Sequence, residues 1–258
     1  MPPLTGPKIH IYAWPERFLY LGPSTSTSQH RNHAATWLMA HDSKLKVTLS
    51  SGETLENEVV YVPSETKFAT EESSALIAAL YWEPESASFH QAAAQFDMAT
   101  PRAFVCQHIK AHELAKLYDA SMSLVDADEL LAKMFGLTTL GGAVAAASDR
   151  RIVEALGFLR AFPERYDSID ALAGRVHLSS SRFAHLFKEQ VGVPVRRYVL
   201  WQKMRRALDL AMAGDSLTTA ALSAGFADSA HLSRTVRAIM GVAPEFLFRH
   251  RERLVVHQ

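Results

Sequence analysis

Residues 168–188 read SIDALAGRVHLSSSRFAHLFK, and residues 216–240 read SLTTAALSAGFADSAHLSRTVRAIM. In each stretch, a short segment with apolar residues, a turn and a second such segment follow one another. In the first stretch Phe183, Leu186 and Phe187 stand at i, i+3 and i+4, which is the spacing of one face of an α-helix. The opposite face of that helix is polar and mostly cationic. The two stretches therefore predict two helix-turn-helix units.

Signals for the helix ends support this prediction. Ser168 and Ser179 are suited to cap the two helices of the first unit. A long helix from about Val195 to Met212 connects the units, and its ~18 residues at ~1.5 Å each span ~27 Å. Successive major grooves on one face of duplex DNA lie ~34 Å apart. The chain is thus expected to read two adjacent turns of DNA; the alternative is a six-helix bundle whose basic faces are merely solvated.

Charge is distributed unevenly along the chain. The 258 residues include 27 Lys and Arg and 27 Asp and Glu, so the formal net charge is zero. Residues 1–149 contain 10 Lys and Arg against 17 Asp and Glu, whereas residues 150–258 contain 17 against 10. Only the C-terminal part therefore has the positive charge expected of a protein that binds a polyanion such as DNA.

The C-terminal part also resembles the AraC/XylS family of transcription regulators, from about Asp149 to Arg249. The matching motifs, in order, are Ser168–Ala173, Leu178–Lys188, Gly192–Pro194, Lys203-Met204-x-x-Ala207-Leu208, Ala221–Asp228, His231–Arg234 and Gly241–Pro244. The ordered spacing of these motifs makes the resemblance specific. His177 departs from the family pattern, which usually has a turn glycine there, but histidine tolerates positive φ better than most residues.

The resemblance implies which residues contact DNA. Ser181 and His185 match base-reading positions of the first unit, and Ser229, Ala230 and Arg234 match those of the second. Arg234 has an alternative role, in which it holds the helices together through an ion pair. The full set of expected DNA-binding residues is Ser179, Ser181, Arg182, His185, Lys188, Ser229, Ala230, His231 and Arg234.

The N-terminal part has short β-like runs separated by turn formers. These runs are Ile9–Tyr12, Phe18–Leu21, Thr36–Met39, Lys46–Leu49, Glu58–Val62 and Leu76–Tyr81, the last of which also suits a helix. Such spacing predicts a small antiparallel barrel or sandwich, and residues 88–135 then become helical. The sequence predicts two domains, residues 1–135 and a DNA-binding domain at 149–258, joined by an uncharged glycine-containing linker at 136–148. The expected fold class is α+β, with an antiparallel β-barrel carrying helices and then an all-α domain.

Residues 1–135 resemble, more loosely, the cupin-like effector domain of the same family. The resemblance implies a pocket for a small-molecule effector, for which Trp37, Tyr61 and Phe68 are the expected lining residues. Aromatic residues of this kind fit a hydrophobic core equally well. The segment Arg102–Tyr118 contains apolar residues that a small barrel cannot wholly bury, which predicts a homodimer.

A metal-dependent cupin enzyme fused to a DNA-binding module is the alternative function. Cupin enzymes bind their metal with a His-x-His pair, a nearby Glu and a later His, because these ligands must converge on one ion. Here two residues separate His30 from His33, and Phe68 stands about where the later histidine would be. We therefore expect no catalytic residues, no metal site and no cofactor, and a protein that is not an enzyme.

Composition limits the compartment and the partners. The single Cys106 excludes an intramolecular disulfide framework. No run reaches the ~18 apolar residues of a membrane helix, and Met1–Tyr12 lacks the apolar core of a signal peptide. The sequence predicts a cytoplasmic protein that binds double-stranded DNA and no membrane. The resemblance to transcription regulators adds RNA polymerase as a further expected partner.

Overall fold

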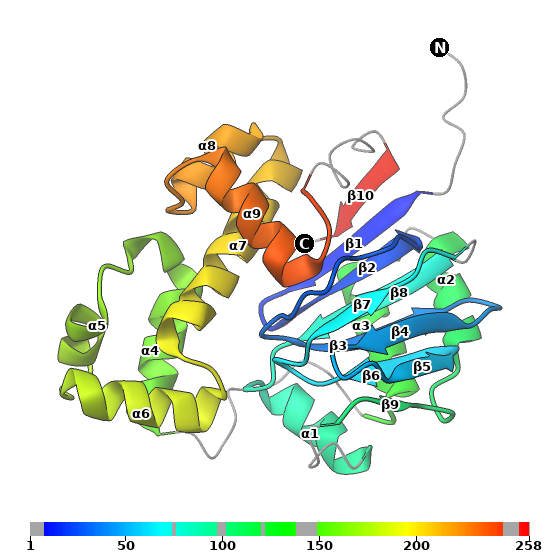
Figure 1. The fold of residues 1–258 in the computed structure, drawn as a ribbon, viewed down its shortest axis with the longest axis horizontal. Helices are drawn as coiled ribbons and strands as arrows, with labels where there is room; N and C mark the ends of the chain where they lie inside the picture. The colour runs from blue at the N-terminus through cyan, green and yellow to red at the C-terminus, as the bar shows by residue number, and fades with distance from the viewer. Residues whose placement is uncertain are drawn as a thin grey trace.

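The computed structural model describes residues 8–73, 76–96, 102–119, 122–137, 149–244 and 253–257. A sheet-rich N-terminal region is followed by a helical C-terminal region (Figure 1), which confirms the expected α+β class. Of the linker expected at residues 136–148, all but the first two residues lie outside the described part of the chain. No helix in the described part is both long and apolar enough to cross a membrane.

The described strands form two sheets. The larger sheet has the order β10 (Leu254–His257), β1 (Ile9–Trp14), β2 (Arg17–Pro23), β8 (Leu76–Trp82), β3 (Ala35–Ala40), β6 (Val59–Val62) and β9 (Phe104–Val105). The smaller sheet has the order β5 (Thr54–Asn57), β4 (Leu45–Leu49) and β7 (Phe68–Thr70). Two open sheets thus replace the closed barrel that the sequence suggested, and Leu76–Tyr81 is a strand. The larger sheet ends at β9 on one side and at β10, which pairs in parallel with β1, on the other.

The N-terminal region also contains α1 (Ala87–Gln95), η1 (Ala111–Leu114), α2 (Ala115–Asp119) and α3 (Leu124–Met134). A first core, between the larger sheet and these helices, includes Trp37, Tyr61, Trp82, Ile109, Leu114, Leu117, Leu131 and Phe135. Ile109, Leu114 and Leu117 are at most 3% exposed. They belong to the segment whose apolar residues suggested a dimer. Because they are buried within the chain itself, they give no reason to expect a partner, and this support for the homodimer is withdrawn.

Apart from β10, the described part of the C-terminal region consists of helices. They are α4 (Arg150–Ala161), η2 (Pro163–Arg165), α5 (Ile169–Arg175), α6 (Ser180–Val191), α7 (Val195–Ala213), α8 (Leu217–Ser223) and α9 (Ser229–Met240). Ser168 and Ser179 cap α5 and α6, each accepting a hydrogen bond from the backbone N–H three residues later. Gly192 and Gly241 end α6 and α9 in the left-handed conformation, which glycine adopts without strain.

Two further cores divide the helical region. A second core joins the other face of the larger sheet, together with the smaller sheet, to the second unit, and contains Leu38, Val60, Phe68, Tyr81, Trp201, Met204, Leu208, Leu232, Val236 and Ile239. A third core holds α4, α5, α6 and the start of α7, and contains Ile152, Leu159, Phe183, Phe187 and Tyr198. The first helix-turn-helix unit therefore has a core of its own, whereas the second unit shares its core with the N-terminal sheet.

Candidate nucleic-acid interface

The first unit presents a polar face on α6. Phe183, Leu186 and Phe187 are buried in the third core, so the amphipathic helix must turn its other side outward. Four of the expected DNA-binding side chains are exposed on that side, namely Ser181, Arg182, His185 and Lys188. Ser179 is also exposed, and its hydroxyl caps the helix by accepting from the Arg182 backbone N–H at 3.4 Å. The side of α6 on which the sequence places the expected DNA-binding residues is thus exposed and mostly cationic.

The second unit presents a comparable face on α9. Asp228 caps this helix, because its carboxylate accepts from the His231 backbone N–H at 2.6 Å. Ala230 and Arg234 are exposed, and Ser229 is half-buried. His231 lies differently from the expectation, since its ring is half-buried and meets the Phe226 ring edge-on at 5.2 Å between centroids. On this face the helix also has an exposed cation that the expected set omitted.

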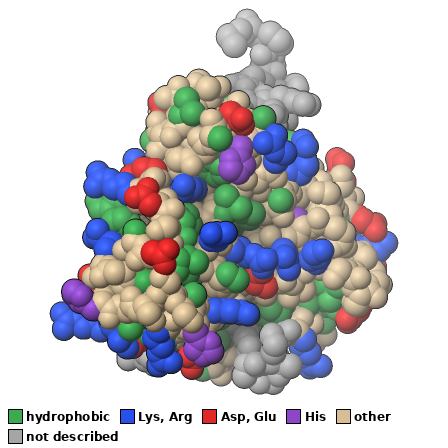
Figure 2. All heavy atoms as spheres, turned by 60° about the vertical axis from the view of Figure 1, so that its left-hand side comes forward, with side chains coloured by type: hydrophobic (Ala, Val, Ile, Leu, Met, Phe, Trp, Pro, Cys, Tyr) green, Lys and Arg blue, Asp and Glu red, His purple; other side chains and the backbone are tan. Residues whose placement is uncertain are grey.

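That cation is Arg237, which stands one turn after Arg234 and is exposed like it. Residues spaced i, i+3 lie on the same side of a helix, so the spacing of Arg234 and Arg237 in the sequence already indicated that both lie on this face. Arg234 forms no ion pair with any residue in the described ranges. Figure 2 shows the side on which the helical region comes forward, where Lys and Arg side chains cover more of the surface than Asp and Glu do.

The turn of each unit requires positive φ at one position. In the first unit this residue is His177, with φ of 55°, and in the second it is Gly225, with φ of 80°. The turn therefore forms with histidine in the left-handed conformation, as expected from the tolerance of histidine for positive φ. A Cβ atom at Gly225 would lie 3.1 Å from the Glu164 Cα, so that turn has little room for a side chain.

Replacing His177 with glycine should raise the free energy of unfolding by about 0.5–1 kcal/mol. The left-handed conformation costs an ordinary residue ~1–2 kcal/mol, and glycine avoids this cost. Glycine loses more conformational freedom on folding, which offsets ~0.5–1 kcal/mol of the gain. Urea unfolding measures the change. The reverse substitution, Gly225→His, is the matched control and should destabilise. A loss of stability in His177→Gly would mean that the histidine makes a contact worth more than the strain.

A buried ionic cluster joins the helical region to the N-terminal region. At its centre is Glu83, just after β8, whose side chain is fully buried. One carboxylate oxygen accepts hydrogen bonds from the Trp201 indole at 2.9 Å, the Gln202 amide at 2.8 Å and the Arg205 guanidinium at 2.7 Å. The other oxygen accepts from Arg160 at 2.9 Å. Donors from α4 and α7 thus meet on one side chain of the N-terminal region.

The cluster keeps Glu83 ionised. Burial acts to raise its pKa, but Arg205 and Arg160, followed by His33 and the Trp201 hydrogen bond, lower that pKa to about 2. Arg160 also donates to Glu85 at 3.2 Å, and the other Glu85 oxygen lies 2.9 Å from His33 Nε2. Each buried carboxylate is therefore paired, as the low dielectric of an interior demands.

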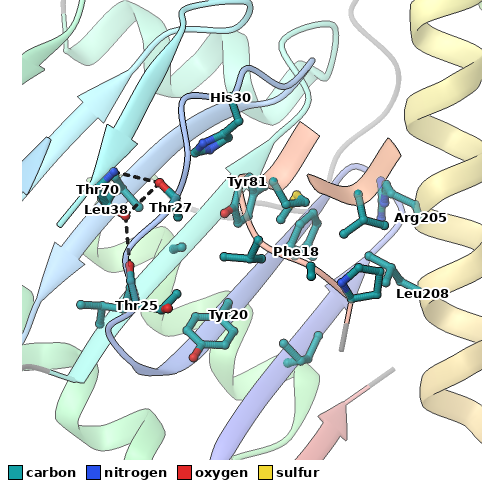
Figure 3. A pocket seen from close by; sticks show the side chains of 18 of the residues that line it. Phe18, Tyr20, Thr25, Thr27, His30, Leu38, Thr70, Tyr81, Arg205 and Leu208 are labelled. Carbon is teal, nitrogen blue, oxygen red and sulfur yellow. Dashed lines mark hydrogen bonds between the residues drawn. The ribbon is translucent and has the colours of Figure 1, made fainter. Parts of the chain in front are cut away.

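A cavity of about 110 Å³ lies between the larger sheet and the second unit (Figure 3). The sheet side and the adjoining loops contribute Ile11, Ala13, Phe18, Tyr20, Thr25, Thr27, His30, Leu38, Phe68, Thr70, Ile77, Ala79 and Tyr81. The helical side contributes Arg205, Leu208, Asp209, Met212, Val236, Met240, Val242, Ala243 and Pro244. A molecule in this cavity would touch α7 and α9 as well as the sheet.

The three aromatic residues expected in the effector pocket are not brought together. Phe68 lines the cavity, whereas Trp37 and Tyr61 pack against each other in the first core with their ring centroids 4.8 Å apart. His30 and His33 also contact different groups. His30 Nδ1 lies 2.8 Å from the Ser28 carbonyl oxygen and His33 faces Glu85. Within the described ranges, no group of three or more His, Cys, Asp or Glu could hold a metal ion.

Comparison with known proteins agrees with this architecture. Residues 172–250 match the family model described as "Helix-turn-helix domain", and no curated protein matches the chain. A ToxT structure from Vibrio cholerae O395 is 14% identical and has a TM-score of 0.55, covering 90% of this chain and 96% of that one. ToxT bound to (E)-4-(8-methylnaphthalen-1-yl)but-3-enoic acid is 13% identical, with a TM-score of 0.54 and coverages of 93% and 98%.

A third structure, unsaturated fatty acid bound wild-type ToxT from Vibrio cholerae strain SCE256, is 13% identical. Its TM-score is 0.53, and the match covers 90% of this chain and 94% of that one. At such identities the three likenesses show a shared fold. That fold extends over both the sheet-rich and the helical regions of the chain.

Proposed function

We propose that this chain, whose residues 172–250 match the helix-turn-helix family model, is an AraC-type, sequence-specific DNA-binding transcription regulator that responds to a small-molecule effector and is not an enzyme. One observation carries the proposal: α6 and α9 both turn polar, cation-bearing faces to the outside. They are joined by α7, whose 19 residues span ~28 Å. Residues 1–135 are the proposed effector domain and residues 149–258 the proposed DNA-binding domain.

Each reading helix combines base contacts with phosphate contacts in this proposal. Ser181 and His185 on α6, and Ser229, Ala230 and Arg234 on α9, face the base edges, where Ala230 offers only a methyl group. The remaining residues, Ser179, Arg182, Lys188 and His231, are positioned to contact phosphates, which fix orientation without reading sequence. His231 supports the helix through Phe226 as well, so we expect its contribution to be the smaller.

We place the effector site in the cavity between the sheet and the second unit. Ligands have been seen in ToxT, according to the two structures that contain an unsaturated fatty acid and a methylnaphthyl butenoic acid. Phe68 remains a proposed effector-binding residue, and its position in the lining of the cavity supports this role. A ligand enclosed by both regions can favour one arrangement of the second unit over another, which is what effector control requires.

The proposal also names partners beyond the effector. A homodimer would bind paired operator sites through high effective concentration, and light scattering of the full chain at ~10 µM, well above the affinities typical of specific operator binding, tests for it. Contact with RNA polymerase and a cytoplasmic location are the further expectations for a protein with this function.

Selection of bound sequences from random duplex DNA by the full chain is the decisive experiment. We expect one enriched sequence with two half-sites about one helical turn apart. Affinity for it should fall about 10³-fold or more between 50 and 200 mM salt, because each neutralised phosphate releases condensed counterions. Recovery of no preferred sequence, or affinity that is independent of salt, would contradict the proposal. A pool of single-stranded DNA is the control.

A further inference from the structure

Several of the polar groups around the cavity are already hydrogen-bonded within the chain. The Thr70 hydroxyl oxygen lies 3.1 Å from both the Thr25 carbonyl oxygen and the Thr27 hydroxyl oxygen, so that its one proton is donated to one of the two (dashed lines in Figure 3). The Tyr20 hydroxyl donates to the Pro23 carbonyl at 2.9 Å, and His30 Nδ1 is 2.8 Å from the Ser28 carbonyl oxygen. These groups therefore need no hydrogen bond from a ligand.

Arg205 is the one cationic side chain among the described residues that line the cavity, and it is committed elsewhere. Its guanidinium donates to Glu83 at 2.7 Å, to the Pro15 carbonyl at 2.9 Å and to the Trp14 carbonyl at 2.6 Å. A ligand carboxylate that captured Arg205 would leave the buried Glu83 with fewer donors, and unpaired buried charges are costly. Arg205 is thus a poor anchor for an anion.

The remaining charged group in the lining works against an anion as well. Asp209 follows Arg205 by one helical turn on α7 and lines the same cavity. Burial raises the pKa of its carboxyl group, while Arg205 and Arg206 act to lower it. When ionised, Asp209 repels a carboxylate, and when protonated it offers one neutral donor. Neither state provides the cationic partner that a buried carboxylate requires. Arg205 and Arg206, whose charges act on Asp209, would repel a cationic ligand at the same place.

The rest of the lining is apolar and partly aromatic. Phe18 and Tyr81 stack with their ring centroids 4.4 Å apart, and Met212 and Met240 face the same space from α7 and α9. Methionine side chains adapt to irregular shapes and make favourable contacts with aromatic rings. In size, the cavity of about 110 Å³ is comparable with an apolar cavity of ~150 Å³ that admits benzene.

We propose that the effector is an uncharged, apolar molecule about the size of one aromatic ring, recognised by shape and ring contacts in this cavity. The inference rests on the proposed effector site and deepens it. It also sets this chain apart from the ToxT structures, whose ligands are an unsaturated fatty acid and a butenoic acid. In this chain no described lining residue offers a cation that is free to pair with such a group.

The test compares toluene, phenylacetate and benzylamine, which share one phenyl ring and differ in the charge attached to it. Each is added to the full chain at the same concentration and pH 7, and the thermal unfolding midpoint is measured. A ligand that binds only the folded state raises that midpoint. We expect toluene to raise it, with an apparent affinity about tenfold or more above that of either charged probe.

Variants locate the binding. Ala13→Leu and Ala243→Leu add volume inside the cavity from two sides, and each should remove most of the toluene response. Ala171→Leu, at an exposed position of α5, is the matched control and should keep it. A larger response to phenylacetate or benzylamine, no response to any probe, or an unchanged toluene response in both cavity variants would overturn the proposal.

DNA binding is measured on the same preparations. Intact DNA binding with no toluene response would overturn the ligand class and leave the proposed regulator standing. A toluene response that the cavity variants remove, in a protein that selects no DNA sequence, would support the ligand class and count against the regulator.

Discussion

Replacing Glu83 with alanine should lower the free energy of unfolding of the full chain by about 3–5 kcal/mol. The substitution removes the acceptor for four donors and leaves two guanidinium groups, Arg160 and Arg205, inside the protein with their charge partly unpaired. Breaking a buried ion pair from one side is far more costly than losing an exposed one, because the remaining charge is still desolvated. Urea unfolding followed by tryptophan fluorescence measures the loss, since Trp201 lies in the cluster.

Two further variants separate charge from side-chain removal. Glu53→Ala removes an exposed glutamate and should change stability by less than ~0.5 kcal/mol. Glu83→Gln keeps the shape and one acceptor but not the charge, so we expect a loss between those of the two alanine variants. A loss below ~1 kcal/mol in Glu83→Ala would show that the cluster contributes no more than an exposed pair.

The same cluster predicts a pH dependence. The pKa of Glu83 is about 2 in the folded chain, below its ordinary value of 4.5. A lowered pKa means that the ionised form is favoured by folding, so the stabilisation is fully present above pH ~4.5 and is lost as pH falls towards 2. The stability difference between the wild type and Glu83→Gln should therefore shrink across this range. A difference that stays constant from pH 6 to pH 3 would contradict the lowered pKa.

Local structure could be predicted from the sequence because its causes are local. Ser168 and Ser179 cap helices with their own hydroxyl groups, and the i, i+3, i+4 spacing of Phe183, Leu186 and Phe187 sets which side of α6 is buried. The strand runs likewise follow from short β-branched and aromatic segments between turn formers. None of these features depends on residues far away in the chain.

Features that join distant segments could not be predicted. β10 pairs with β1 so that Ile9 lies opposite Leu254. The residue pattern of one strand does not show which other strand it pairs with. Glu83 meets donors more than 70 residues away, so its burial has no local signal. One signal for the contact between the two regions was missed. Buried residues lie on several sides of α7, and a helix that is apolar on several sides must pack against more than the neighbouring helices of its own region.

The effector residues show the same limit. Trp37 and Leu38 are neighbours in β3, and successive residues of a strand point to opposite faces. Trp37 consequently lies in the first core while Leu38 lines the cavity. Both faces of this strand are buried, so the sequence does not show an alternation that could tell the faces apart. The aromatic type of Trp37 suggested a place in the pocket, whereas its side chain packs in the first core.

The outward faces of α6 and α9 lead to the second large effect that we expect. Arg234→Ala should weaken binding to the selected operator by about 1–3 kcal/mol more than binding to scrambled DNA. Arg234 is exposed on α9, where a guanidinium can donate two hydrogen bonds to guanine in the major groove. Preference at one or two base pairs should be relaxed in the variant. Both DNAs are measured at one fixed salt concentration, because salt alone changes affinity.

Arg206→Ala is the matched control, because Arg206 is an exposed arginine on the linker helix α7. It should do little, or should weaken binding to all sequences alike through a lost phosphate contact. Melting curves accompany both variants. Arg234 has no ion-pair partner among the described residues, so its removal should change stability by less than ~0.5 kcal/mol. If Arg234→Ala lowered affinity equally for operator and scrambled DNA, Arg234 would be a phosphate contact. If it mainly lowered the melting temperature, the arginine would hold the helices together and would not read the base.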